Sequence, residues 1–296
     1  MKSTGCIGTH ISMDFTEHFT EEALAERLSG KYIGNSVCFF NEVDSTNNIA
    51  YRLALHGASE GTVVIAERQT KGKGRLNRSW QSPPQCNLYT SIILKPDVNP
   101  VFAPQITLMT GVAVAEFLSR YQLADVNLKW PNDVLIGVKK ICGILTEMKT
   151  SADRLIDFIV VGIGININIK KEDFDESFRD ISTSLKEETG KDISRLDVAE
   201  ALYNHFERWY TIWKTRGFSP VREEWLKYSF MVGKRIQVDF RGNIQTGDML
   251  GIDEFGALLV SDEEGMIKKL MAGDATVIKN DDIVKSQQPS ILSLQV

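Results

Sequence analysis

The sequence predicts an α+β protein that ends in a small all-β domain. Between residues 20 and 231, short β-rich runs alternate with segments of helical periodicity. Near residue 232 the helical segments stop, and short β-type runs separated by glycines follow, which is typical of a small barrel. With 296 residues, 43% of them hydrophobic, the chain can bury a sizeable core in one or two domains.

The helices are predicted from caps and from apolar periodicity. A helix over 19–30 has acids in its first turn and a glycine at its end, and a helix over 44–57 begins at Asp44 or Ser45. Apolar residues recur at helical spacing over 104–121, which predicts an amphipathic helix. Strands are expected at 36–43, 61–68, 87–95, 126–130, 141–149 and 155–165, and one or two further helices at 195–230.

The C-terminal segment supports a division into domains. Residues 235–278 contain the β-type runs "RIQVDF", "GDMLGIDEFG", "ALLVSDEEG" and "MIKKLMAGD". We therefore expect a weakly ordered lead-in over 1–19, a larger domain over 20–231, a β-barrel domain over 232–280 and a polar tail over 281–296.

Charge and cysteine usage exclude several functions. The chain has 34 Lys and Arg against 39 Asp and Glu, and a net charge of −5 argues against broad binding of nucleic acid or anionic membrane. Its four cysteines are scattered without a zinc-type pair, which favours reduced thiols and a cytoplasmic location. No apolar run of membrane-spanning length and no signal-peptide core are apparent, so no membrane association is expected.

The stretch "KGKGRLNRSW", from Lys71 to Trp80, places four cations and two glycines in one loop of this acidic chain. Glycine lets a ligand approach the backbone closely, and an arginine fork matches carboxylate or phosphate, so the loop suits an anion. A solvated hairpin tip is an equally good interpretation of the composition. The spacing fits neither a P-loop nor Gly-x-Gly-x-x-Gly, because position 77 is Asn.

Two further stretches combine apolar strands with polar groups. In "LKWPNDVLI", Lys129 lies on a solvent face or against an anion, and the Asn132–Asp133 turn offers oxygen atoms that could hold Mg²⁺. In "GIGININI", glycines interrupt a strand where a ligand could approach, and Asn166 carries an amide suited to a base such as adenine. Without further context, the usual interpretation of "GIGININI" is a strand end that turns into a loop.

Taken in order, these stretches resemble the biotin protein ligases of the biotin/lipoate ligase family. The resemblance extends from about Asp44 to Asp274, and its motifs are "DSTN", "AERQTKGKGRLNRSW", "KWPND", "KKICGILTE" and "VGIGININ", with a glycine-rich end. It implies a mixed sheet with flanking helices, like a class II aminoacyl-tRNA synthetase core, and a C-terminal SH3-like domain. It also implies that biotin and MgATP form biotinoyl-5′-AMP, whose acyl group passes to one lysine of a carboxyl carrier domain.

The resemblance assigns roles to individual residues of the 20–231 domain. It implies Lys129 and Arg75 as catalytic cations and Asp133 as a Mg²⁺ ligand. The biotin site that it implies comprises Ser45, Thr46, Asn47, Gln69, Gly72, Lys73, Gly74, Arg75 and Lys129. The ATP and adenylate site comprises Lys73, Arg75, Trp80, Lys129, Asn132 and Asn166.

The loop departs from the family pattern at two positions. Lys73 replaces an arginine, which keeps the charge but loses the bidentate fork, and Asn77 replaces a glycine. Because asparagine tolerates a positive φ, we expect the turn to survive. The glycines and the uncompensated cations predict that the loop is mobile without ligand.

Three alternatives remain open at this level. A lipoate ligase would use the same adenylation chemistry, a transcriptional regulator would bind DNA, and a silent binder would retain the pocket alone. The 43 residues before Asp44 contain one helix-like stretch and no recognisable recognition helix, so we expect a ligase without specific DNA binding. A homodimer is possible by analogy with the family.

Overall fold

The computed structural model describes residues 19–28, 31–123, 125–151 and 155–278. The predicted tail over 281–296 and nearly all of the lead-in therefore lie outside the described residues. Phe19, the last residue assigned to that lead-in, is buried and packs edge-on against Phe39.

A seven-stranded mixed sheet forms the centre of the molecule, in the order β1-β2-β3-β7-β6-β5-β4. Only the β1–β2 pair is parallel, and every other neighbouring pair is antiparallel. Its strands are β1 (Ser36–Val43), β2 (Thr62–Gln69), β3 (Leu88–Leu94), β4 (Val126–Lys129), β5 (Asp133–Ile136), β6 (Lys139–Thr150) and β7 (Ile156–Ile165).

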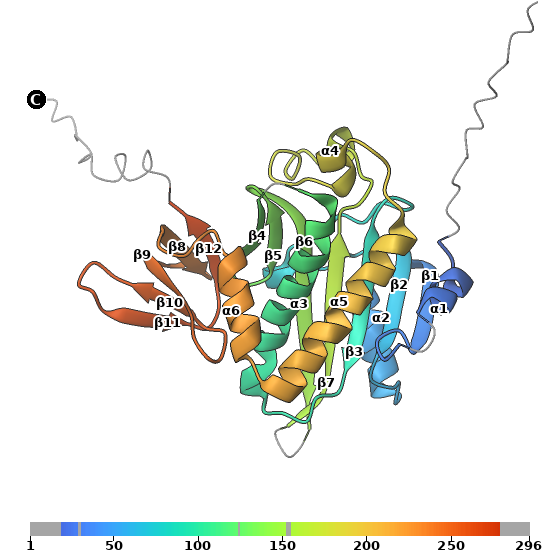
Figure 1. Cartoon of the computed structure of the whole chain (residues 1–296), viewed down its shortest axis with the longest axis horizontal. Coiled ribbons are helices and arrows are strands. Elements are labelled where there is room, and N and C mark those ends of the chain that lie inside the picture. The colour runs from blue at the N-terminus through green and yellow to red at the C-terminus, as the bar shows by residue number, and fades with distance from the viewer. Residues whose placement is uncertain (1–18, 29–30, 124, 152–154, 279–296) are drawn as a thin grey trace, which may run out of the picture.

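Helices cover both faces of this sheet. Figure 1 shows α3 and α5 crossing one face, and α2 packs with β2, β3 and β7 in a separate apolar cluster. The helices are α1 (Glu21–Arg27), α2 (Thr46–Leu55), α3 (Ala103–Leu118), α4 (Leu185–Thr189), α5 (Arg195–Arg216) and α6 (Ser219–Tyr228). The short 3-10 turns are η1 (Arg75–Asn77), η2 (Pro100–Phe102), η3 (Ser119–Tyr121) and η4 (Lys171–Asp173).

Helix α3 is the core helix, and the prediction that it is amphipathic is wrong. Thirteen of its 16 residues are buried, since the sheet, α5 and α6 pack around it and the turn between β9 and β10 contacts it. The segment Pro100–Tyr121 has the length and composition of a membrane span, with a mean hydropathy of 1.5 over its most apolar 18 residues, but 72% of those 18 residues are buried inside the fold. Its apolar character is explained by its place in the core.

The C-terminal domain is a five-stranded antiparallel sheet in the order β11-β10-β9-β8-β12. Its strands are β8 (Arg235–Phe240), β9 (Asn243–Ile252), β10 (Leu258–Ser261), β11 (Ile267–Leu270) and β12 (Asp274–Val277). The turn between β9 and β10 anchors it to the larger domain, because Gly256 O accepts a hydrogen bond from Trp130 Nε1 at 3.1 Å. In addition, Gln105 Nε2 on α3 donates to Glu254 O at 2.7 Å.

Most of the predicted elements are present, and the differences lie in short ones. The segment 195–230 forms two helices that meet at Gly217. Three short elements that the sequence did not indicate are β5, α4 and β12. Strand β5 begins at Asp133, so the predicted Asn132–Asp133 turn is brief.

Candidate functional site

A cavity of about 540 Å³ lies against the sheet on the face that α2 covers. Every residue predicted for the site lines this cavity except Gly72. The segments that bring them together are the start of α2, the end of β2, the loop after β2, the β4–β5 turn and the residue after β7, and the first half of β6 adds further lining residues. A volume of this size is within the range of small-molecule sites.

Glycines on β7 create the floor of the cavity. Because side chains alternate along a strand, Phe158, Val160, Gly162 and Gly164 share the face that α2 covers, and the first two pack in the α2 cluster. At Gly162 a Cβ atom would lie 2.1 Å from Asn47 Oδ1. The missing side chains therefore leave the space that the polar groups occupy.

A polar network holds the start of α2 at one end of the cavity. Gln69 Oε1 accepts hydrogen bonds from Thr46 N at 2.9 Å and from Thr46 Oγ1 at 3.2 Å. Asn47 Nδ2 donates to Glu147 Oε2 at 2.8 Å, while its Oδ1 accepts from Ser91 Oγ at 2.6 Å. Thr46, Asn47, Gln69 and Ser91 are buried or half-buried and satisfied, so they form a fixed set of neutral donors and acceptors, with the Glu147 carboxylate behind Asn47.

Ser45 occupies the N-cap position of α2 and is buried in the cavity wall. Its backbone N–H donates to Asp44 Oδ1 at 2.8 Å, and Asn48 Nδ2 donates to Asp44 Oδ2 at 2.7 Å. Burial works to raise the pKa of Asp44, but these hydrogen bonds outweigh it and hold that pKa below its ordinary value. Asp44 thus stays ionised and fixes the first turn.

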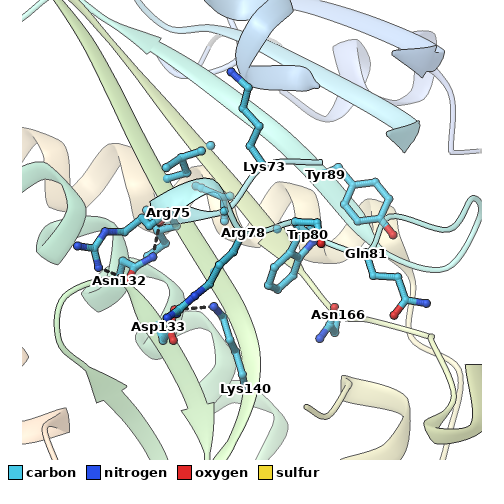
Figure 2. A pocket seen from close by; sticks show the side chains of 18 of the residues that line it. Lys73, Arg75, Arg78, Trp80, Gln81, Tyr89, Asn132, Asp133, Lys140 and Asn166 are labelled. Carbon is cyan, nitrogen blue, oxygen red and sulfur yellow. Dashed lines mark hydrogen bonds and ion pairs between the residues drawn. The ribbon is translucent and has the colours of Figure 1, made fainter. Parts of the chain in front are cut away.

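Trp80, labelled in Figure 2, lines the cavity and lies on a pair of glycines in the sheet. Gly143 on β6 and Gly164 on β7 are cross-strand partners, and Cβ atoms there would come within 2.9 Å and 2.5 Å of the Trp80 ring. Lys140 Nζ sits over this ring, 5.3 Å from its centroid. The indole ring therefore lies directly on the two glycines of the sheet, with the Lys140 ammonium close to it.

The cationic loop folds as a tight hairpin. Gly72 O accepts from Trp80 N at 2.9 Å, and Gly74 N donates to Arg78 O at 2.7 Å. A Cβ atom at Gly72 would lie 2.3 Å from Trp80 O, so only glycine permits this approach. Asn77 has a φ of +61°, which confirms the expectation that asparagine supports the turn.

Three of the four cations of the loop, Lys73, Arg75 and Arg78, have carboxylate partners in this structure, so the expectation that the cations are uncompensated is wrong for these three. Arg75 NH1 donates to Asn132 Oδ1 at 3.2 Å and to Gly273 O at 3.3 Å, and it lies 3.4 Å from Asp274 Oδ1. Arg78 NH2 lies 2.5 Å from Asp274 Oδ2, an ion pair without hydrogen-bond geometry. Burial lowers the pKa of Arg75, and the Asp274 carboxylate opposes that change.

Lys73 points away from the other labelled groups of the cavity (Figure 2). Its Nζ donates to Asn48 Oδ1 and lies 3.5 Å from Glu147 Oε1. The ammonium therefore faces the start of α2 rather than Trp80 or Asn166, although the residue lines the cavity.

Lys129 ends β4 and is half-buried in the cavity wall, before a cis Trp130–Pro131 bond. Among the described residues, it is the cavity cation that forms no ion pair. Asn132, on the other side of that bond, donates from Nδ2 to Ile144 O at 2.8 Å. Lys129 is therefore available to an incoming anion, and Asn132 is fixed beside Arg75.

Asp133 is engaged by a neighbouring cation. Its Oδ1 lies 2.6 Å from Lys140 Nζ, and the described part of the chain holds no group of three or more His, Cys, Asp and Glu side chains able to bind a metal ion. The residues present do not fit a resident metal site, so a magnesium ion would enter with the phosphates of its nucleotide.

The two asparagines after β7 separate in space. Asn166 is buried, lines the cavity and donates from Nδ2 to Thr183 O at 3.0 Å. Asn168 instead pairs with the backbone of Ile193, donating to its oxygen at 2.8 Å and accepting from its nitrogen at 2.9 Å. Asn166 is therefore a cavity residue, and Asn168 tethers the segment before α5.

Sequence reasoning missed several residues that shape the cavity. Gly143 carried a signal, since it interrupts an apolar strand as Gly162 and Gly164 do. Lys140, Ser91 and Asp274 carried none, because their parts depend on contacts with residues distant along the chain.

Comparisons with known proteins agree with this architecture. Residues 39–166 match the biotin/lipoate A/B protein ligase family, and residues 232–277 match the biotin protein ligase C-terminal domain. The bifunctional ligase/repressor BirA of Bacillus spizizenii is 36% identical over 86% of this chain and 78% of its own length. The biotin--[acetyl-CoA-carboxylase] ligase of Paracoccus denitrificans is 31% identical over 75% of this chain and 92% of its own length.

A solved structure shows the same fold. Biotin protein ligase from Aquifex aeolicus, in complex with biotin and ATP, superposes with a TM-score of 0.71 at 32% identity, covering 83% of this chain and 99% of that one. A mixed sheet with a cavity under a cationic loop and a separate C-terminal β-domain is thus the architecture of an acyl-ligase family. The chain belongs to the biotin/lipoate A/B protein ligase family, among its biotin protein ligases.

Proposed function

We propose that this protein activates biotin with ATP and transfers the biotinoyl group to a lysine of a biotin carboxyl carrier domain. The observation that carries the proposal is the division of one cavity into two chemical halves. Fixed neutral groups around Thr46 and Gln69 suit an uncharged ureido ring, whereas Lys129 and Arg75 suit anions. Trp80 offers a flat surface to an adenine ring.

The proposed first step joins two anions. A carboxylate oxygen of biotin attacks the α-phosphorus of ATP, the bond from that phosphorus to the bridging oxygen breaks, and pyrophosphate leaves. No proton is transferred, so the site needs cations rather than a base. Lys129, which pairs with no carboxylate in the described part of the chain, and Arg75 reduce the repulsion between carboxylate and phosphate.

In the second step, the lysine amine attacks the acyl carbon, AMP leaves with the bonding pair, and the amine loses a proton. The remaining assignments to the biotin half are Ser45, Asn47, Gly72, Lys73 and Gly74, and those to the adenylate half are Lys73, Asn132 and Asn166. Mg²⁺ is part of the nucleotide substrate, and Asp133, whose Oδ1 pairs with Lys140, is the residue assigned to it.

The domain assignment belongs to the same proposal. Residues 20–231 form the biotin- and ATP-binding domain, similar to a class II aminoacyl-tRNA synthetase core, and residues 232–280 form an SH3-like domain. A homodimer in the cytoplasm stays a prediction. Because relatives include ligase/repressors, a gel-shift assay with the chain's own biotin-operon DNA tests whether this protein also binds DNA.

The direct test is mass spectrometry of a carrier domain incubated with the protein, biotin and ATP. We expect one biotinoyl group on one lysine. Biotin-dependent exchange of pyrophosphate into ATP tests the first step alone, and the same assay with lipoate separates the two ligase classes. Exchange that responds to lipoate and not to biotin would overturn the proposal.

A further inference from the structure

An open cleft on the outer side of the cationic loop belongs to neither half of the cavity. Residues 71–79 line it together with Leu145, Glu147 and Arg241, which is the turn residue between β8 and β9. Much of the same loop lines the reaction cavity on its other side. The loop is therefore the wall between the cavity and the cleft.

The cleft is strongly cationic although the chain carries a net charge of −5. Its charged residues are five cations and one acid, namely Lys71, Lys73, Arg75, Arg78, Arg241 and Glu147. Among the described residues, Lys71 and Arg241 form no ion pair, whereas the other three cations have carboxylate partners. Two exposed cations from different domains thus face the cleft without a counter-charge.

The backbone of Arg241 adopts an unfavourable conformation in the turn between β8 and β9. Its φ is +55° and that of Gly242 is +84°, so both central residues of the hairpin turn have positive φ. Asparagine, aspartate and glycine suit such a turn, whereas arginine at a positive φ is uncommon and costs of the order of 1 kcal/mol. A strained, unpaired arginine beside the reaction cavity indicates a role outside the stability of the fold.

Apolar groups accompany these cations. Leu76 in the loop is 42% exposed and also has a positive φ of +52°, and Phe240 is 40% exposed beneath the Arg241 guanidinium. Exposed aromatic, aliphatic and arginine side chains are typical of protein interfaces, whereas a nucleotide tail needs only the charges. We propose that this cleft docks an acidic face of the protein that receives the acyl group, with carboxylates meeting Lys71 and Arg241.

This inference rests on the proposed function, since a protein acceptor must bring its lysine to the cavity beside the cleft. Complementary charge at such a rim chiefly raises the rate of encounter and is screened by salt. The expected signature is therefore a change in the KM for the carrier domain that leaves the adenylation step untouched.

The experiment compares the full-length protein with Lys71→Glu, Arg241→Glu and the double variant, and uses Lys31→Glu as a matched surface control. We expect the double variant to raise the KM for a biotin carboxyl carrier domain about tenfold at low salt. Biotin-dependent pyrophosphate exchange, and trapping of the adenylate by hydroxylamine, should match the unmodified protein. Added NaCl should raise the KM of the unmodified protein but not that of the double variant, because the two glutamates repel an acidic face and salt screens that repulsion.

Arg241→Asn provides a second readout that a structural role would not give. Because asparagine suits the turn, its melting temperature should equal or exceed that of the unmodified protein, while the carrier KM rises about threefold or more. An unchanged KM for the carrier domain in all variants overturns the inference. A loss of pyrophosphate exchange in the variants also overturns it, because Lys71 and Arg241 would then contribute to the reaction with ATP. If the unmodified protein shows no biotin-dependent exchange, the proposed function itself has failed, whatever the variants do.

Discussion

Asp274 at the start of β12 is the anchor that ties the cationic loop to the C-terminal domain, and its removal gives a quantitative prediction. The Arg75 and Asp274 side chains are 23% and 22% exposed and lie 3.4 Å apart. A hydrogen bond to a charged group in such a place stabilises by about 1.5–3 kcal/mol. Arg78 is 67% exposed, so its pairing with Asp274 adds no more than about 1 kcal/mol.

Asp274→Ala should therefore lower the free energy of opening the loop by about 2 kcal/mol, which raises the open population roughly 30-fold. Trypsin reports this population directly, because the loop contains Lys71, Lys73, Arg75 and Arg78. When opening is fast relative to cleavage, the rate of cleavage follows the open population. We expect mass spectrometry to show cleavage within 71–79 at a rate about tenfold or more above that of the unmodified protein.

The matched control for this measurement is Asp262→Ala. Asp262 is another partly buried carboxylate of the C-terminal domain, and it pairs with Lys268 at 3.1 Å within its own hairpin. Its variant should leave cleavage of the loop unchanged. If Asp274→Ala and Asp262→Ala were cut within the loop at the same rate, the reasoning that Asp274 holds the loop would be refuted.

Four further variants test the cavity. Lys129→Ala should slow biotin-dependent pyrophosphate exchange on the order of 10²–10³-fold and weaken biotin binding less; exchange near the unmodified rate would remove Lys129 from the mechanism. Gln69→Ala should weaken biotin binding by about 1–3 kcal/mol in calorimetry while circular dichroism stays unchanged, and equal affinity would contradict its place in the pocket. Gly162→Ala should abolish biotin binding, because its Cβ would lie 2.1 Å from Asn47 Oδ1; full affinity by calorimetry would disprove this constraint. Arg75→Ala should release biotinoyl-AMP, so that a biotin blot shows acylated proteins other than the carrier, and unchanged specificity would argue against retention by the loop.

The parts of the fold that follow from local sequence could be predicted well. Thr20 caps α1 through a 3.3 Å contact with Ala23 N, and Gly57 follows the end of α2, as expected from cap chemistry. Strands β1, β2, β3 and β7 are continuous β-rich runs, which a single-sequence pattern can detect. Strand β5 was not predicted, because its first residue, Asp133, follows Pro131 and Asn132 and has the turn preference of aspartate.

The partners of the loop could not be predicted, because they are set by tertiary contacts. Arg75 and Asp274 are 199 positions apart, and no local pattern connects them. The same holds for Lys140, which reaches Trp80 and Asp133 only after β5 and β6 have paired. The glycines and charges of the loop predict a mobile segment. In the structure, Asp274 of the C-terminal domain holds this loop through contacts that form only when the chain folds.

The cavity exists because large side chains are missing from one face of the sheet. The glycines of the cavity therefore help to identify the site as much as its charged residues do. On β7, Phe158 and Val160 fill the space under α2, and the next two residues on that face are glycines. If large residues had continued to alternate along β7, their side chains would have packed against α2 and filled the space of the cavity. The glycines instead admit Asn47 and Trp80, each held by contacts from more than one strand. A substitution that fills either gap therefore removes the site without removing any functional group, which is why Gly162→Ala separates the shape of the cavity from its chemistry.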